Sequence, residues 1–219
     1  MFHVKNGIAA GFALIVLFAS SVALAQSDPG AEAARLRESG GDPVAGKEKS
    51  FLCQGCHGAD GISFESVIPK LAGQYGGYIA KQIHDYQSGI RSHPIMNAMA
   101  GTVNEADLAD IGAYFNSQIK MKGNGAASNP LGEDIFLHGD ISKNRIACMG
   151  CHGLNGKGAG SRSSMFPVLG GQQKDYIRKQ LIDFRSNYRV NSPNGIMNTM
   201  TKLLTDAEIE ALAEYISAQ

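Results

Sequence analysis

The feature that most constrains this chain is a five-residue motif that occurs twice and takes up all four cysteines. Residues 53–57 read Cys-Gln-Gly-Cys-His, and residues 148–152 read Cys-Met-Gly-Cys-His. Both copies keep two cysteines three positions apart, followed at once by a histidine. Any fold of this chain therefore has to provide two equivalent surroundings for this motif.

The repetition continues beyond the motif. Pro69-Lys-Leu-Ala-Gly-Gln74 returns as Pro167-Val-Leu-Gly-Gly-Gln172, and residues 78–82 return as residues 176–180, with Tyr, Lys and Gln kept. A period of this size excludes short solenoid repeats and predicts two tandem domains, residues 26–122 and residues 130–219. Between them, residues 123–129 have the Gly, Ala, Ser and Asn composition of a flexible linker.

Helical signals occur in both halves. Apolar residues repeat at helical spacing over residues 78–86 and again over 176–184. Asp42-Pro43 and Asn129-Pro130 each combine an N-cap residue with a proline at the first helical position. Thr205 and Glu208 form a capping box. Strand signals are absent, so the predicted fold class is all-α.

The first 25 residues have the pattern of a secretory signal. Lys5 precedes an apolar run over residues 7–18, and Ala23-Leu-Ala25 offers a cleavage site. This pattern predicts export, to the periplasm in a Gram-negative bacterium. The alternative is an uncleaved anchor, because about 20 residues can cross a bilayer; Ser20 and Ser21 within this stretch favour cleavage.

The Cys-x-x-Cys-His motif is the attachment site of c-type haem. Its two thiols can reach the vinyl groups on one porphyrin edge, and the adjacent histidine is placed to bind the iron. Two covalently bound haems c are therefore predicted, held by Cys53, Cys56, His57, Cys148, Cys151 and His152. A Cys₄ zinc site leaves both histidines unexplained, and redox-active disulfides would require a βαβ context.

A repeated pair of methionines supplies candidates for the second axial ligand. Ile95-Met-Asn-Ala-Met99 returns as Ile196-Met-Asn-Thr-Met200, and Met/His ligation raises the reduction potential of a haem. On spacing alone, Met96 with Met197 and Met99 with Met200 are equal candidates. His84 and His93 have no histidine counterpart in the other half, so they are not favoured as ligands.

Together these blocks, over residues 42–219, resemble the dihaem cytochrome c4 family. The resemblance implies two class I cytochrome c domains related by a pseudo-twofold axis, with the haem edges facing each other. It also implies that Met96 and Met197 bind the irons. Helix crossings are implied at Gly46 with Tyr114 and at Gly132 with Tyr215. The extension over residues 26–41 departs from the family pattern.

The resemblance implies a carrier of electrons, not an enzyme, working between a membrane quinol-oxidising complex and a terminal oxidase or reductase. Its docking would be transient, with membrane association only through its partners. The alternative is the electron-accepting subunit of a dehydrogenase or flavocytochrome. A dihaem peroxidase is disfavoured, because it needs an open iron site. Equal numbers of basic and acidic residues, 20 each, argue against nucleic-acid binding.

The two halves differ slightly in charge. Residues 26–125 hold 9 Lys and Arg against 11 Asp and Glu, whereas residues 126–219 hold 10 against 9. This asymmetry suggests that each domain docks on a different redox partner. An equally weighted alternative is ordinary scatter, because steering depends on local patches more than on net charge.

Overall fold

The structure, a computed structural model, describes residue 1 and residues 40–123, 125, 129–159 and 165–219. Within these ranges the regular structure is helical, apart from one isolated bridge between Asp140 and Arg145. The all-α prediction is therefore confirmed. The predicted signal peptide, apart from Met1, and residues 26–39 of the extension lie outside the described residues. No helix within the described part is long and apolar enough to cross a membrane.

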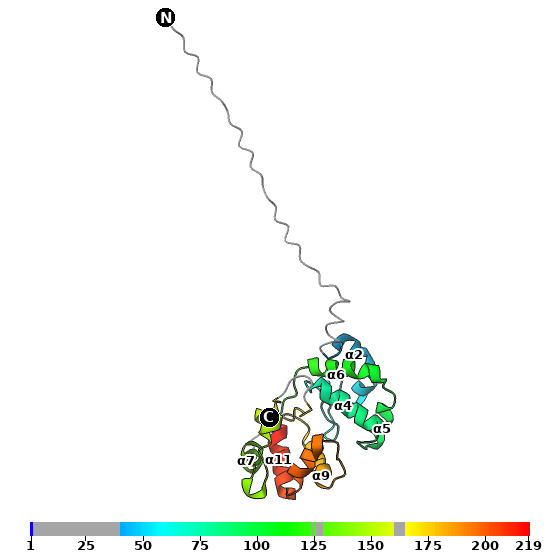
Figure 1. Ribbon diagram of the computed structural model, residues 1–219. Helices are drawn as coiled ribbons and strands as arrows, with labels where there is room; N and C mark the ends of the chain where they lie inside the picture. The colour runs from blue at the N-terminus through cyan, green and yellow to red at the C-terminus, as the bar shows by residue number, and fades with distance from the viewer. Residues whose placement is uncertain (2–39, 124, 126–128, 160–164) are drawn as a thin grey trace.

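The first domain packs its helices against α6, the helix that ends it. Both α2 and α4 lie on α6, and α5 packs against α4 (Figure 1). Its elements are α2 (Pro43–Lys49), α3 (Phe51–His57), α4 (Gly76–Gln87), α5 (Pro94–Ala100), η1 (Glu105–Asp107) and α6 (Leu108–Ser117).

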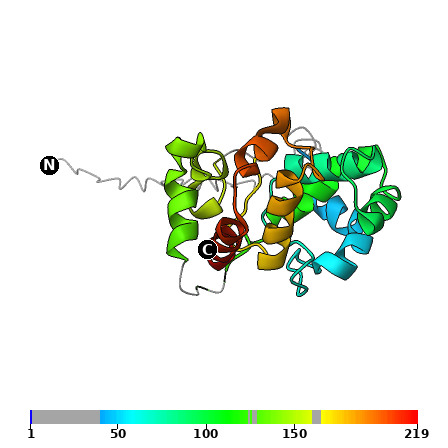
Figure 2. The ribbon, with the colours of Figure 1, turned by 90° about the horizontal axis from the view of Figure 1, so that it is seen from below.

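The second domain repeats this arrangement around α11, on which α7 and α9 pack while α10 packs on α9. Two views show the domains lying side by side (Figures 1 and 2). The elements are α7 (Pro130–His138), η2 (Ile141–Lys143), α8 (Met149–His152), η3 (Leu154–Gly156), α9 (Lys174–Arg185), η4 (Pro193–Gly195), α10 (Ile196–Thr201) and α11 (Asp206–Ala218).

Sequence-encoded caps start several of these helices. The side chains of Asp42 and Asn129 accept backbone N–H bonds in the first turns of α2 and α7, each ahead of a proline. Thr205 and Glu208 form the predicted capping box at the start of α11. These groups satisfy backbone donors that a helix leaves free, which fixes where each helix begins.

In each domain the first and last helices cross at a glycine. A Cβ at Gly46 would lie 1.9 Å from the carbonyl oxygen of Asp110, and one at Gly132 would lie 2.0 Å from that of Ala211. Either atom would also come within 2.9 Å of the Cβ of a tyrosine, Tyr114 or Tyr215 respectively. Only glycine allows this close approach, so both predicted crossings are confirmed.

Each domain has its own apolar core, and a smaller cluster joins the two domains. This cluster consists of Tyr75 and Met121 from the first domain and Val168 from the second. Gly123, the first residue of the predicted linker, donates its backbone N–H to the carbonyl of Gln219. The segment that follows the first domain is therefore hydrogen-bonded to the last residue of the second domain. Residues 124 and 126–128 of the predicted linker lie outside the described ranges.

Candidate functional site

The two motif histidines share one environment. His57 and His152 are buried, with Nδ1 2.8 Å from the carbonyl oxygen of Pro69 and 2.9 Å from that of Pro167. Because a carbonyl can only accept, Nδ1 carries the proton and Nε2 keeps its lone pair. Burial lowers the pKa of both histidines, although the carbonyl bond opposes it. Each histidine is thus a neutral imidazole with a nitrogen free for a metal.

In the second domain the predicted ligands come together around one cavity. Cys148, Cys151, His152, Met197 and Met200 all line it. The rest of the wall is mainly apolar and includes Ile135, Phe136, Leu169, Leu181, Leu212 and Ile216. Two thiols, an imidazole and two thioethers on an apolar cavity include the donor set of a covalently attached haem.

The first domain places its candidates similarly. Cys53 and Met96 pack against the first apolar core, whereas Met99 is not among the residues that do so. The exposed Cys56 and the buried His57 belong to the same helix, α3. His93 accepts a hydrogen bond from the backbone N–H of Met96 and so caps α5.

The first cysteine of each motif does not have the character of a redox-active thiol. Burial raises the pKa of Cys148 to about 11, and it also raises the pKa of Cys53. Reactive cysteines have a lowered pKa. Moreover, Cys53 packs against the core of the first domain and Cys148 against that of the second. This separation favours two haem sites over one shared zinc site.

Two buried arginines, Arg91 and Arg189, cross the domain boundary in a pseudo-symmetric network. Each donates to a glutamine of its own domain and to a glutamine and a tyrosine of the other. The distances are 2.7, 2.8 and 3.1 Å from Arg91 to Gln82, Gln180 and Tyr176, and 2.6, 2.9 and 3.1 Å from Arg189 to Gln180, Gln82 and Tyr78.

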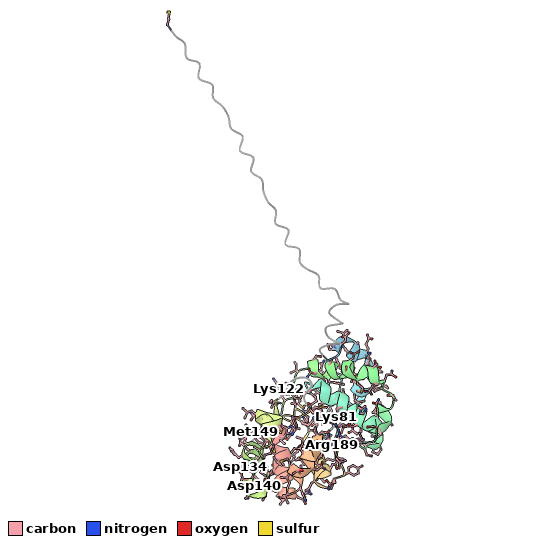
Figure 3. All side chains as sticks on the ribbon, viewed as in Figure 1. Lys81, Lys122, Asp134, Asp140, Met149 and Arg189 are labelled. Atoms are coloured by element: carbon pink, nitrogen blue, oxygen red, sulfur yellow. The ribbon has the colours of Figure 1, made fainter. Side chains whose placement is uncertain are left out.

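Lys81 adds to this network from α4. Its Nζ donates to the backbone carbonyl of Asn191, at 2.8 Å, and pairs with Asp85 of its own helix. Lys81 and Arg189 lie near each other where the two domains meet (Figure 3). The sequence repeat contains both arginines at the same offset as the glutamines, so this signal could have identified them.

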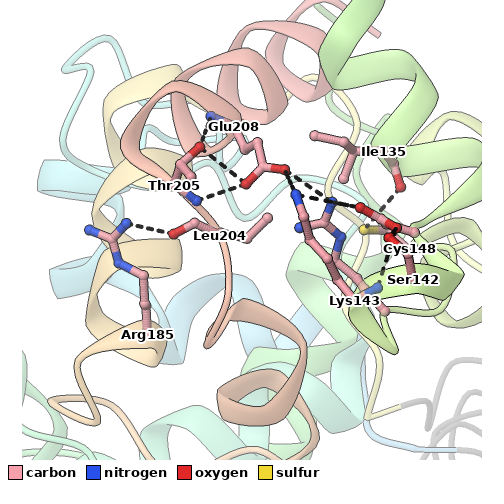
Figure 4. Close-up of polar contacts among 10 residues, drawn as sticks. Ile135, Ser142, Lys143, Cys148, Arg185, Leu204, Thr205 and Glu208 are labelled. Carbon is pink, nitrogen blue, oxygen red and sulfur yellow. Dashed lines mark hydrogen bonds and ion pairs between the residues drawn. The ribbon is translucent and has the colours of Figure 1, made fainter.

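A third arginine, Arg145, belongs to the second cavity alone. It lines the cavity with 5% of its surface exposed, and its Nη2 lies 3.2 Å from Oε1 of Glu208. Its Nε and Nη1 have no hydrogen-bond partner in the described part of the chain. Glu208 also receives bonds from Thr205 and Lys143, close to Cys148 (Figure 4). The sequence repeat gives no signal for Arg145, because Ser50 stands at the matching position of the first half.

Comparison with known proteins decides the family. Cytochrome c4 of Pseudomonas aeruginosa is 41% identical over 184 residues, which cover 83% of this chain and 90% of that protein. The chain belongs to the cytochrome c4 family. A family model for cytochrome c matches residues 135–219. The crystal structure of reduced recombinant cytochrome c4 from Pseudomonas stutzeri matches with a TM-score of 0.75 and 38% identity, covering 81% of this chain and 98% of that one.

Another relative bears a different description. The thiosulfate dehydrogenase electron acceptor of Stutzerimonas stutzeri is 32% identical over 185 residues, which cover 82% of each chain. Membership in the cytochrome c4 family, together with both Cys-x-x-Cys-His motifs, makes this chain a dihaem electron-transfer protein with two covalently attached haems c. The sequence resemblance is confirmed at this level.

Proposed function

We propose that the protein carries electrons in the periplasm between a membrane quinol-oxidising complex and a terminal oxidase or reductase. The observation that carries this proposal is the position of the two proline-bearing segments that hydrogen-bond the motif histidines. Pro69 and Pro167 hold the two imidazoles, and the residue after each proline is hydrogen-bonded to the other domain. Both sites therefore adjoin one buried boundary, which suits transfer of an electron between domains.

The chain supplies the same four groups to each haem. The cysteines would tether it, and the histidine Nε2 together with Met96 or Met197 would ligate its iron. When bound, the haem provides an iron that gains or loses one electron. Burial keeps water from the histidines, and the proline carbonyls fix the orientation of their rings. Met/His ligation suits a carrier working at a raised potential.

Methionine substitutions test this ligation. Met96→Ala and Met197→Ala should each abolish the sulfur–iron charge-transfer band of one domain and lower the potential of its haem. Met99→Ala and Met200→Ala are matched controls from the same short helices, and they should keep both bands. Loss of a band in a control, but not in its partner, would assign the ligand to the other methionine.

Reduction by membranes tests the proposed role. Oxidised protein is mixed with quinol and membranes that contain the quinol-oxidising complex, and haem reduction is followed by absorbance. Rapid reduction, blocked by an inhibitor of that complex, is the expected result. A protein that the membranes do not reduce would not be this carrier.

A second role is favoured by the thiosulfate dehydrogenase electron acceptors. Under this alternative the protein receives electrons from a dehydrogenase of that kind. Mixing the oxidised protein with thiosulfate dehydrogenase and thiosulfate discriminates the two roles. Reduction in this mixture that is much faster than with membranes would favour the alternative.

A further inference from the structure

A buried glutamine of the first domain grips the backbone of the second. The side-chain Nε2 of Gln74 donates to the carbonyl oxygen of Val168 at 2.9 Å, and its Oε1 accepts the backbone N–H of the same residue at 2.9 Å. Gln74 is 4% exposed. One amide side chain thus satisfies both backbone groups of one residue, which fixes its position as a strand partner would.

Gln172 forms the reciprocal contact. Its Oε1 accepts the backbone N–H of Lys70 at 2.7 Å, and its Nε2 donates to the carbonyl oxygen of Lys70 at 2.9 Å. Gln172 is also buried, at 5% exposure. Both glutamine oxygens accept a second bond, from the backbone N–H of the next residue in their own chain segment. The two contacts, here called the glutamine clasps, therefore share one geometry.

Each clasp ends one residue from a group that orients a histidine. Val168 follows Pro167, whose carbonyl accepts from His152, and Lys70 follows Pro69, whose carbonyl accepts from His57. Hydrogen bonds and one peptide link therefore connect Gln74 of the first domain to His152 of the second. In the same way they connect Gln172 of the second domain to His57 of the first. Both connections pass through the domain boundary.

We propose that Gln74 and Gln172 are positioning residues, each of which sets the reduction potential of the haem in the opposite domain. This inference rests on the proposed ligation by His57 and His152. A hydrogen bond to Nδ1 makes an imidazole a stronger electron donor to its metal, which stabilises the oxidised iron. Releasing Val168 lets the Pro167 carbonyl move away from His152, so the potential of the second haem rises.

The test uses the full-length protein with both haems and the variants Gln74→Leu and Gln172→Leu. A redox titration is followed by NMR through the paramagnetically shifted ring signals of His57 and His152, which report each haem separately. Gln74→Leu should raise the reduced-to-oxidised ratio of the second haem at a fixed solution potential by at least about threefold, leaving the first unchanged. Gln172→Leu should do the reverse.

Gln173→Leu is the matched control. Gln173 also crosses the boundary and donates to a backbone carbonyl, that of Ser63, at 2.8 Å, but its side chain is not hydrogen-bonded to Lys70 or Val168. This variant should leave both ratios near those of the unaltered protein. A loosened boundary that admits water would lower the potentials, because a polar surrounding favours the more highly charged oxidised site. The expected rise therefore separates positioning from loosening.

Four outcomes overturn the proposal: a shift confined to the variant's own domain, equal shifts of both haems, a fall in potential, or no shift. If Gln74→Leu loses its haem, Gln74→Met, which is uncharged and close to glutamine in size, also removes both bonds to Val168 and should shift the same haem in the same direction. Histidine rings without paramagnetic shifts in the unaltered protein would instead refute the ligation itself, and no variant is needed to see that.

Discussion

The two haem sites differ most in the chain between the first helix and the cysteine motif. Seven positions separate Gly46 from Cys53, whereas sixteen separate Gly132 from Cys148. In the first domain Ser50 alone lies between α2 and α3. In the second domain the longer stretch contains η2 and Arg145. The cysteines, histidine and methionine of the haem site are thus repeated in both domains. The segment before the cysteines, which contributes Arg145 to the cavity wall of the second domain, is not repeated.

The acidic start of the last helix shows what this difference does. In the first domain Lys49, with a side chain 35% exposed, pairs with Asp107 and Asp110. In the second domain Glu208 pairs with Lys143 and with the buried Arg145. The acidic start of the last helix therefore pairs with a partly exposed lysine, Lys49, in the first domain. In the second domain it pairs with Arg145, a buried arginine in the cavity wall. The comparison teaches that one ligand set can be tuned separately in each copy.

The largest expected effect tests how far the domains fold as separate units. Gly132→Ala places a methyl group against the backbone of α11 and should destabilise the second domain by about 3 kcal/mol or more, because α7 and α11 must move apart. Gly46→Ala should do the same to the first domain. Denaturant unfolding, followed through the haem of each domain, measures the effect.

Gly150→Ala and Gly55→Ala are suitable controls, since a Cβ at either position meets nothing within 4 Å. Both should leave the unfolding midpoints close to those of the unaltered protein. If Gly132→Ala unfolds both domains in a single transition, the boundary between them is as strong as their cores, and the two-unit description is wrong.

The next largest effect concerns the positive charge of Arg145 in the cavity wall of the second domain. An arginine keeps its positive charge in proteins, and a buried positive charge favours the reduced haem. Arg145→Met should therefore lower the reduced-to-oxidised ratio of the second haem by on the order of tenfold at a fixed solution potential. The first haem should not change. Redox titration that resolves both haems is the measurement.

Glu208→Gln is the opposing variant. It removes the nearer of the two carboxylates that offset Arg145, the other being that of Asp140 at 3.7 Å, so the same ratio should rise. A simple loosening of the pocket would move both variants in the same direction. Shifts of equal sign would therefore show that Arg145 acts through packing and not through its charge.

A smaller effect appears in the dependence of stability on pH. Burial by itself would raise the pKa of Glu208, but bonds from Thr205, Lys143 and Arg145 outweigh it and hold the pKa at about 2, against an ordinary value of 4.5. A carboxyl with a lowered pKa adds stability above its unfolded value, and this stability is lost as the pH falls towards the folded value. The second domain should weaken between pH 4.5 and 2.

Urea unfolding at several pH values within this window measures the loss. Glu208→Gln should flatten the dependence for the second domain, because the amide does not titrate. In the first domain the pKa of Asp107 is also lowered, chiefly by its bond to Lys49, but this pair lies nearer the surface. The first domain should therefore change less over the same window. An unaltered slope in Glu208→Gln would contradict this assignment.

The sequence predicted the parts of the fold that depend on local or repeated signals. The helix starts at Asp42, Asn129 and Thr205 follow from caps that act within one turn. The all-α class and the two haems follow from periodicity and from the duplicated motif. The crossings at Gly46 and Gly132 came from the family resemblance, because an isolated glycine has many possible causes.

The remaining features depend on contacts between distant segments. Gln74 and Gln172 were recognised as repeated residues, yet their partners lie 94 and 102 positions away in the chain. Arg145 is absent from the first copy, so comparison of the repeats passes over it. The composition of residues 123–129 predicted a linker, but it could not show that Gly123 packs against the C-terminus. Hydrogen bonds between segments so far apart in the chain form only when the two domains fold against each other, so no local sequence pattern predicts them.

The smallest expected effect concerns the difference in charge between the halves. If each domain docks on its own partner, reversing one exposed charge should alter one association rate only. Glu65→Lys in the first domain and Lys202→Glu in the second change exposed residues, and Lys202 does not line the cavity of the second domain. Each should change the rate of association with one partner by about twofold at low ionic strength, and added salt should remove the difference because exposed charges are screened.

Stopped-flow reduction by the donor and oxidation by the acceptor, over a salt series, measure both rates. Rates that ignore salt, or variants that slow the same partner equally, would leave the asymmetry as ordinary scatter. The functional difference between the domains would then lie in the walls of their haem cavities alone, and Arg145 would be its main cause.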